Sequence, residues 1–191
     1  MITTDSRVAA RAAYPWLRPA AVTASLLLLG YGILRLIDSW DGARDKQGWA
    51  WLTGHSLFLL GVVLFGAVIL GLRGLLLAAS PRQRALTEAA TVTGLVGAAA
   101  FVRVILGDIF AGFADAVPPS DVVLVGGPAL FEVGLLVLLV RAALVQPRLL
   151  PAWSPGAVFV GFAAIAVELD LLPIGAALVL AGLLPLGRPT R

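Results

Sequence analysis

The stretch from Val122 to Leu144, VVLVGGPALFEVGLLVLLVRAAL, is apolar along almost its whole length and carries one acid, Glu132, near its middle. An α-helix needs about 20 such residues to cross the hydrocarbon core of a bilayer, since each residue adds about 1.5 Å to a path of about 30 Å. The stretch therefore predicts a transmembrane helix. Three more stretches meet the same criterion, at residues 16–37, 51–78 and 86–113.

The apolar stretch at residues 154–186 is too long for a single span, even for a tilted helix. Within it, Glu168 and Asp170 are followed by Pro173. Two carboxylates followed by a proline favour a reversal of the chain. We therefore expect two short spans here, at residues 155–167 and 171–186.

The composition supports a membrane protein. Hydrophobic residues make up 60% of the chain and charged residues 13%, whereas soluble domains carry about 25% charged residues. There is no cysteine, which excludes disulfides, thiolate metal sites and a cysteine nucleophile. The length leaves no room for a separate soluble domain. The sequence predicts an all-α integral membrane protein, with residues 1–191 forming one compact bundle of about six transmembrane helices.

The basic residues are distributed unevenly between the two sides of a six-span bundle. Only Arg44 and Lys46 fall on one side, and all the other arginines outside the membrane core fall on the opposite side. Because cytoplasmic loops carry the excess of Lys and Arg, we expect both termini in the cytoplasm. The net charge of +3 then reflects topology and not nucleic-acid binding. The arginines on the cytoplasmic side are Arg7, Arg11, Arg18, Arg73, Arg82, Arg84, Arg141, Arg148, Arg188 and Arg191.

Ionisable residues within the expected spans gather towards the outer, non-cytoplasmic end. Such residues are costly in a bilayer and are therefore candidates for a functional site. Glu132 lies near mid-depth and Arg103 closer to the outer end, while the inner half holds almost none. The pattern predicts a polar cavity that opens outwards, above an apolar inner half. Within about two turns of the outer surface we expect Arg35, His55, Asp108, Glu168 and Asp170.

Helical spacing places several of these residues beside aromatic rings. Residues three, four or seven apart lie on the same side of an α-helix, and two such sets are found in the first two expected helices. The sets are Tyr31, Arg35 and Asp38, and Trp51, His55 and Phe58. Further aromatic residues expected around the outer half are Trp49, Phe101, Phe110, Phe113, Phe131 and Phe162.

Acids outnumber arginines in this layer. Burial and mutual repulsion both disfavour the charged form of a carboxyl group, so at least one acid is expected to be neutral at pH 7. Glu132 is the deepest, and Pro128 should bend its helix one turn earlier. The expected catalytic set is Glu132 as general acid, Asp108 and Glu168 as supporting acids, and His55 as orienting group or proton relay.

The remaining polar and aromatic residues are expected to bind substrate. Arg103 should also neutralise Glu132 or Asp108 within the cavity. One histidine without cysteine does not make a zinc site, so neither a metal nor a cofactor is expected. The expected substrate contacts are Arg103, Arg35, Asp38, Asp170, Tyr31, Trp51, Phe58, Phe101, Phe131 and Phe162.

Each of these residues also has a structural interpretation. Arg35, Glu168 and Asp170 could mark helix ends at the membrane interface. His55 could be a hydrogen-bonded structural histidine, and an Arg103–Glu132 pair could serve only to hold the bundle together.

Carboxylic acids surrounded by aromatic rings suit the protonation of an apolar, lipid-soluble substrate, because aromatic faces shelter cations. In this general layout of short helices with acids and aromatics at the core, the chain resembles the small integral-membrane terpenoid cyclases. The resemblance implies a buried carboxylic acid, here Glu132, that opens a terminal epoxide or protonates an alkene. The implied partners are a lipophilic small molecule and the lipid bilayer; the oligomeric state is left open.

Two other functional classes fit the sequence. Six short helices with an outward-facing polar pocket are also similar to the vitamin-binding subunits of energy-coupling-factor transporters. A proton-coupled exporter would use Glu132 as its coupling site. A pocket that is closed to water but open to lipid would favour the cyclase, whereas a water-filled vestibule would favour the binding subunit.

Overall fold

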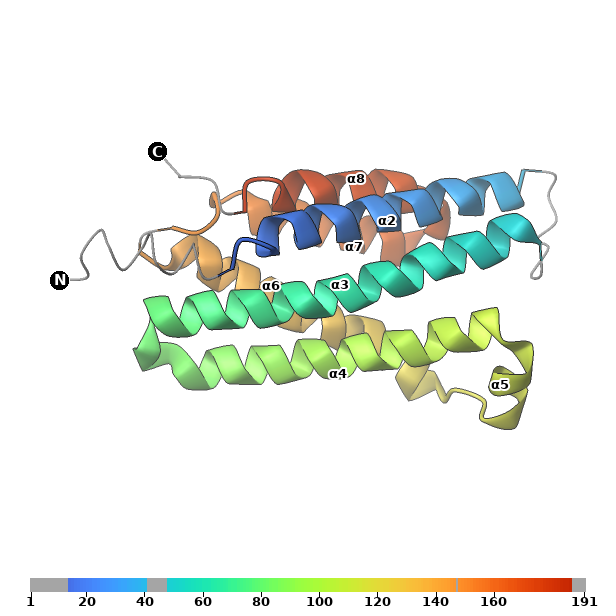
Figure 1. Ribbon diagram of the computed structural model, residues 1–191, viewed down its shortest axis with the longest axis horizontal. Helices are drawn as coiled ribbons and strands as arrows, with labels where there is room; N and C mark the ends of the chain where they lie inside the picture. The colour runs from blue at the N-terminus through green and yellow to red at the C-terminus, as the bar shows by residue number, and fades with distance from the viewer. Residues whose placement is uncertain (1–13, 41–47, 147, 187–191) are drawn as a thin grey trace.

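The computed structural model describes residues 14–40, 48–146 and 148–186, and within these ranges the chain is all-helical, without strands. Four of its helical segments are apolar and long enough to cross a membrane. They are α2 (Leu17–Asp38), α3 (Trp49–Ala79), α4 (Arg84–Ile109), and α6 (Gly127–Leu144) together with the helical turn before it. Figure 1 shows them running along the long axis of the molecule. Among the charged residues used to infer topology, Arg7, Arg11, Arg44, Lys46, Arg188 and Arg191 lie outside the described ranges.

The C-terminal apolar stretch forms two short helices, as the sequence predicts. Helix α7 (Ser154–Val167) and helix α8 (Leu172–Leu183) are separated by a 3₁₀ turn at Leu169–Leu171. The Glu168 side chain accepts a hydrogen bond from the Asp170 backbone N–H at 3.3 Å. Pro173 then occupies the first turn of α8, where its missing N–H leaves no helical hydrogen bond unmade. These residues therefore stop one helix and start the next.

The third apolar helix is shorter than the sequence predicts. Helix α4 ends at Ile109 and not at residue 113, because Phe110 adopts an extended conformation with φ −116° and ψ 92°. The chain then forms the short helix α5 (Ala111–Ala116), which folds back on the end of α4. A Cβ at Gly107 would lie 3.4 Å from the Ala114 Cβ, which is ordinary van der Waals contact, so α5 packs directly on the last turn of α4.

The fourth apolar helix begins irregularly. Pro128 cannot donate a backbone hydrogen bond, and its ring crowds the carbonyl one turn earlier. The chain accommodates the proline with a π-helical turn, Val122–Gly126, immediately before α6. The sequence predicts a bend at Pro128, and the structure places a π turn there, a feature frequent at functional sites.

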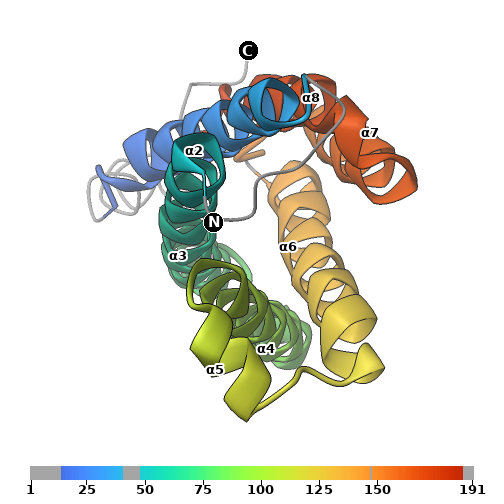
Figure 2. The same cartoon turned by 90° about the vertical axis from the view of Figure 1, so that its right-hand side faces the viewer.

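The long helices form a closed ring. Figure 2 looks along the bundle and shows them in the order α2, α3, α4, α6, α7 and α8, and each helix contacts the next around the ring. Glycines bring two of these pairs into backbone contact. A Cβ at Gly97 in α4 would lie 2.6 Å from the Gly127 carbonyl oxygen, and one at Gly161 in α7 equally close to the Gly175 carbonyl oxygen in α8. Small residues at such crossings are typical of helices that pack within membranes.

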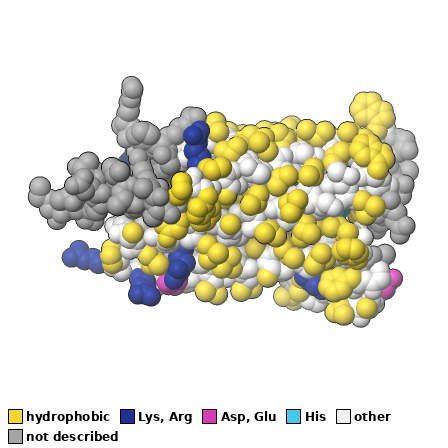
Figure 3. Space-filling model, in the orientation of Figure 1, with side chains coloured by type: hydrophobic (Ala, Val, Ile, Leu, Met, Phe, Trp, Pro, Cys, Tyr) yellow, Lys and Arg dark blue, Asp and Glu magenta, His cyan; other side chains and the backbone are white. Residues whose placement is uncertain are grey.

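The half of the bundle at the α3–α4 turn is filled by aliphatic side chains. Ile69, Leu72 and Leu76 of α3 and Leu138 and Leu139 of α6 are fully buried there. Apolar side chains also cover much of the described surface on the face that Figure 3 shows, with charged residues towards the two ends. The half of the bundle that the sequence predicts to be apolar is therefore filled with aliphatic side chains; its side of the membrane stays a prediction.

Candidate ligand cavity

A cavity of about 330 Å³ lies inside the other half of the ring, and all six ring helices contribute to its wall. This half contains the last turns of α2 and α4 and the first turns of α3, which the sequence predicts to lie at the outer side. Its lining is almost entirely apolar, whereas the sequence predicts a polar cavity. The side chains from α2 and α3 are Leu28, Tyr31, Phe58, Val62 and Phe65; the others are Phe101, Pro128, Phe131, Glu132, Phe162, Ile165, Ala166, Leu169 and Leu172.

Aromatic rings form a continuous network around the cavity. Phe131, which is 2% exposed, stands at the centre of this network. Its ring packs edge-to-face against three other rings, at centroid distances of 5.7–5.8 Å. Edge-to-face pairs at such distances are favourable because the positive edge of one ring meets the negative face of another. The three rings are those of Phe65, Phe101 and Phe162, and Phe58 and Tyr31 extend the network towards α2. Five aromatic residues predicted as substrate contacts therefore line one cavity.

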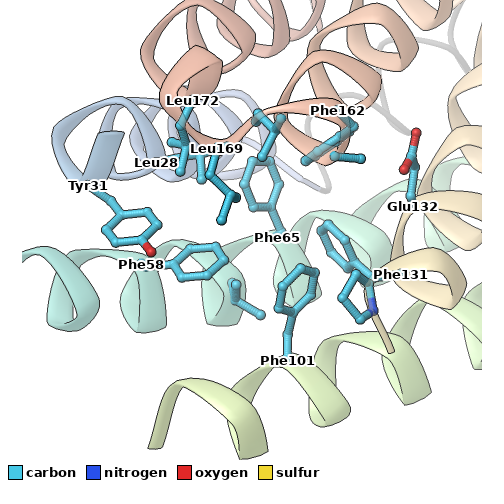
Figure 4. A pocket seen from close by; sticks show the side chains of 14 residues that line it. Leu28, Tyr31, Phe58, Phe65, Phe101, Phe131, Glu132, Phe162, Leu169 and Leu172 are labelled. Carbon is cyan, nitrogen blue, oxygen red and sulfur yellow. The ribbon is translucent and has the colours of Figure 1, made fainter. Parts of the chain in front are cut away.

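Glu132 is the acid that lines this cavity. Its side chain is half-buried. Within the described residues it has no hydrogen-bond or ion-pair partner. Figure 4 shows its carboxylate beside Phe162, across the cavity from Tyr31, with the phenylalanine rings between them. Charging a carboxyl group is costly where neither water nor a cation compensates it, so this environment favours the neutral acid.

His55, Trp51 and Asp108 form a separate polar cluster near the outer end. The His55 side chain is buried, and its Nδ1 lies 2.9 Å from the Trp51 carbonyl oxygen. Because a carbonyl only accepts hydrogen bonds, Nδ1 must be the donor. Nε2 lies 3.7 Å from the Asp108 Oδ2, and the Trp51 indole N–H donates to the Asp108 carbonyl oxygen at 3.1 Å. These contacts connect the first turns of α3 to the end of α4. They fit the alternative in which His55 is a hydrogen-bonded structural histidine.

The small pocket beside this cluster has a volume of about 10 Å³, enough for about one water molecule. It is lined by Arg35 and Asp38, together with Tyr31, Trp51 and His55. The Arg35 side chain is 9% exposed, and its Nε has no hydrogen-bond partner within the described residues. Arg35, Asp38, Trp51 and His55 are therefore brought together, but outside the large cavity. Tyr31 lines both spaces.

The expected ion pair of Arg103 is not found. Its guanidinium lies 4.2 Å from the centre of the Phe113 ring. The Nη1 and Nη2 atoms are buried without a hydrogen-bond partner in the described residues. The reason is geometric: α5 folds back over the end of α4 and presents Phe113 to the guanidinium, which a continuous helix would not allow.

Glu168 and Asp170 also lie outside the cavity. Both side chains are exposed at the turn between α7 and α8, where Glu168 caps the 3₁₀ helix. The prediction that Glu168 supports Glu132 as a second acid is therefore not met by this geometry. Among the other aromatic residues, Trp49 and Phe110 are exposed on the surface, at 68% and 59%.

Sequence reasoning missed part of the cavity wall. Phe65 lies seven residues after Phe58, hence on the same face of α3, and this spacing could have identified it. The aliphatic wall from Leu28, Val62, Ile165 and Leu172 has no such signal, because leucine, isoleucine and valine occur on every face of these helices.

The described part of the chain contains no group of three or more His, Asp or Glu residues able to hold a metal ion. Searches of protein-family models, of curated proteins and of solved structures found no match for this chain.

Proposed function

We propose that the chain crosses the membrane six times with both termini in the cytoplasm. Arg18, near the start of α2, donates a hydrogen bond to the Leu184 carbonyl oxygen just after α8. The start of the first helix and the end of the last one therefore lie at the same end of the bundle. The α3–α4 turn, with its arginines, lies at that end too (Figure 1). Helices α7 and α8, of 14 and 12 residues, extend about 20 Å each. This is shorter than the hydrocarbon core, and local thinning of the bilayer is one way to accommodate such a hairpin.

Single cysteines test this topology, since the natural chain has none. Ser120→Cys, in the exposed segment after α5, should react with an impermeant thiol reagent from outside intact cells. Arg82→Cys, exposed in the α3–α4 turn, should react only after the membrane is opened. Reaction of both variants from the same side would contradict the six-span topology.

We further propose that the cavity binds a compact apolar molecule and that Glu132 protonates it to start a cyclisation. The observation that carries the proposal is a single carboxyl group, without a partner in the described residues, in a wall of aromatic rings. A volume of about 330 Å³ is near the lower limit for small-molecule sites, about 300 to 1,000 Å³. This size favours a short isoprenoid over a full-length lipid.

The proposed reaction is an isomerisation. The Glu132 carboxyl proton passes to an alkene carbon or an epoxide oxygen of the substrate, and the resulting cation is attacked by another double bond of the same molecule. Phe101, Phe131 and Phe162 face the space where the positive charge develops and stabilise it through cation–π interactions. A carbon next to the final cation then gives a proton back to the Glu132 carboxylate. Atoms and charge balance, and the acid is regenerated.

The geometry limits the roles of the other acids. Asp108 lies in the outer polar cluster and Glu168 at the α7–α8 turn, so the proposal needs neither for the protonation step. His55 is on the opposite side of the aromatic network from Glu132.

The outer pocket of about 10 Å³ is too small for a vitamin-sized polar ligand, which disfavours the binding-subunit alternative.

The proposal is tested by incubating the purified protein with a panel of prenylated and epoxidised terpenoids and searching for products of unchanged mass. Glu132→Gln retains size but has no transferable proton, so turnover should fall by about 10²- to 10⁴-fold. Glu168→Gln, an exposed acid outside the cavity, is the matched control and should retain activity. Full activity of Glu132→Gln would exclude Glu132 as the acid. Binding of an apolar compound without conversion would favour transport through the same cavity.

A further inference from the structure

A second cavity lies at the arginine-rich end of the bundle, far from the aromatic site. It has a volume of about 590 Å³ and lies between the α3–α4 turn and the last turns of α6. Its polar side chains are Ser80, Gln83, Arg141 and Gln146. The remainder of the wall is aliphatic and includes Leu86, Val140 and Leu144, all of which are also exposed on the outer surface of the bundle. The cavity is therefore a groove open to the outer surface of the bundle, which faces lipid in the proposed topology, and the inference below rests on that topology.

The charge in this groove has no counterion in the described residues. The Arg141 side chain is 6% exposed. Its Nε donates to the Gln83 side-chain oxygen and its Nη1 to the Gln83 backbone oxygen, both at 3.2 Å, and both acceptors are neutral. A buried guanidinium without an anion is costly. An anionic group in the groove would remove that cost.

Glu88, an acid at the same end of the bundle, is already paired with another arginine. Glu88 accepts two hydrogen bonds from Arg73, at 2.6 and 2.7 Å, and lies 3.7 Å from Arg84. It therefore does not neutralise Arg141. Arg82 is exposed at the same end and adds to the positive charge there. Figure 3 shows Lys and Arg side chains gathered at this end of the molecule.

We propose that this groove binds an anionic phospholipid of the cytoplasmic leaflet. The lipid phosphate would approach Arg141 beside Gln83 and Ser80, and an acyl chain would lie along Val140 and Leu144. Basic pockets between transmembrane helices on the cytoplasmic side recognise anionic headgroups in this way, because phosphate and guanidinium attract each other strongly where water is scarce. The aliphatic wall selects a lipid over a free anion.

The test is a thermal unfolding measurement of the full chain in a neutral detergent, with either phosphatidylglycerol or phosphatidylcholine added. Phosphatidylglycerol should raise the wild-type Tm by about 5 to 10 °C more than phosphatidylcholine does, the shift expected when a ligand is present at about 100 times its Kd. The exposed-arginine control Arg84→Gln should keep this difference between the lipids. Arg141→Met should lose it.

A second variant keeps the test decisive if Arg141→Met does not fold. Val140→Trp leaves the arginine in place and fills the lipid-facing wall, so it too should lose the difference between the two lipids. Equal effects of both lipids on the wild type would overturn the proposal, as would a difference that survives in the groove variants. Inorganic phosphate alone should leave the Tm unchanged; an equal shift with phosphate would assign the groove to a free anion.

Discussion

Two carboxyl groups of this bundle lie in opposite environments. Glu88, at the arginine-rich end, is held by Arg73 through both oxygens and has Arg84 nearby. Glu132, in the aromatic cavity, faces rings and aliphatic side chains and has no partner within the described residues. A carboxylate that is fully paired contributes to structure and stays ionised. One held without a partner in an apolar site is costly to charge and is available for proton transfer.

The same contrast extends to the packing around each acid. The interior of the half at the α3–α4 turn is filled by fully buried aliphatic residues such as Ile69, Leu72 and Leu138, and the groove of that half opens on the outer surface of the bundle. The interior of the other half encloses a cavity of about 330 Å³. An unfilled volume reduces stability because the lining atoms lose contacts. The densely packed interior of one half therefore stabilises a fold that leaves, in the other half, a volume open to the proposed ligand.

Replacing each acid by its amide should separate the two environments most clearly. Glu88→Gln breaks a two-bond pair and leaves Arg73 without its counterion, so we expect the Tm in detergent to fall by about 3 °C or more. Glu132→Gln loses no such bond and should unfold at the wild-type temperature or above. A fall of equal size in both variants would mean that Glu132 also has a structural partner.

Arg103 should show a smaller effect. In Arg103→Leu the cation–π contact with Phe113 is lost, but two buried nitrogens without partners are removed as well. These contributions oppose each other, so the Tm should change by less than about 2 °C. A calorimetric scan of the variant beside the wild type measures this. A large destabilisation would indicate that Arg103 neutralises an acid, as the sequence alone predicts.

The sequence predicts the helices well because a bilayer imposes strong requirements on them. Runs of apolar residues identify α2 and α3 within two residues, and the proline after Glu168 and Asp170 identifies the α7–α8 turn. The end of α4 was wrong, because the apolar sequence continues through Phe110 and Phe113 while the backbone turns at Phe110. Hydropathy records the environment of a segment and not its backbone path.

The site is predicted only in part. Glu132 and the five aromatic residues could be grouped from depth and helical spacing, and they do line one cavity. Depth singles out Glu132 as the deepest acid, but it could not show that Asp108 and Glu168 lie outside the cavity. Which of them points inwards depends on the rotation of each helix in the ring, and that is set by close contacts such as Gly97 on Gly127. Such contacts join residues distant in sequence.

The protonation state of Glu132 provides the most direct test of this difference between the two acids. An infrared difference spectrum at pH 7 between wild type and Glu132→Gln isolates the absorption of this one side chain. We expect the carbonyl stretch of a neutral carboxylic acid to be present in the wild type and absent in the variant, because the apolar cavity disfavours the charged form. If the wild type instead shows a pair of carboxylate bands that the variant lacks, Glu132 is ionised at pH 7. It could not then act as the general acid.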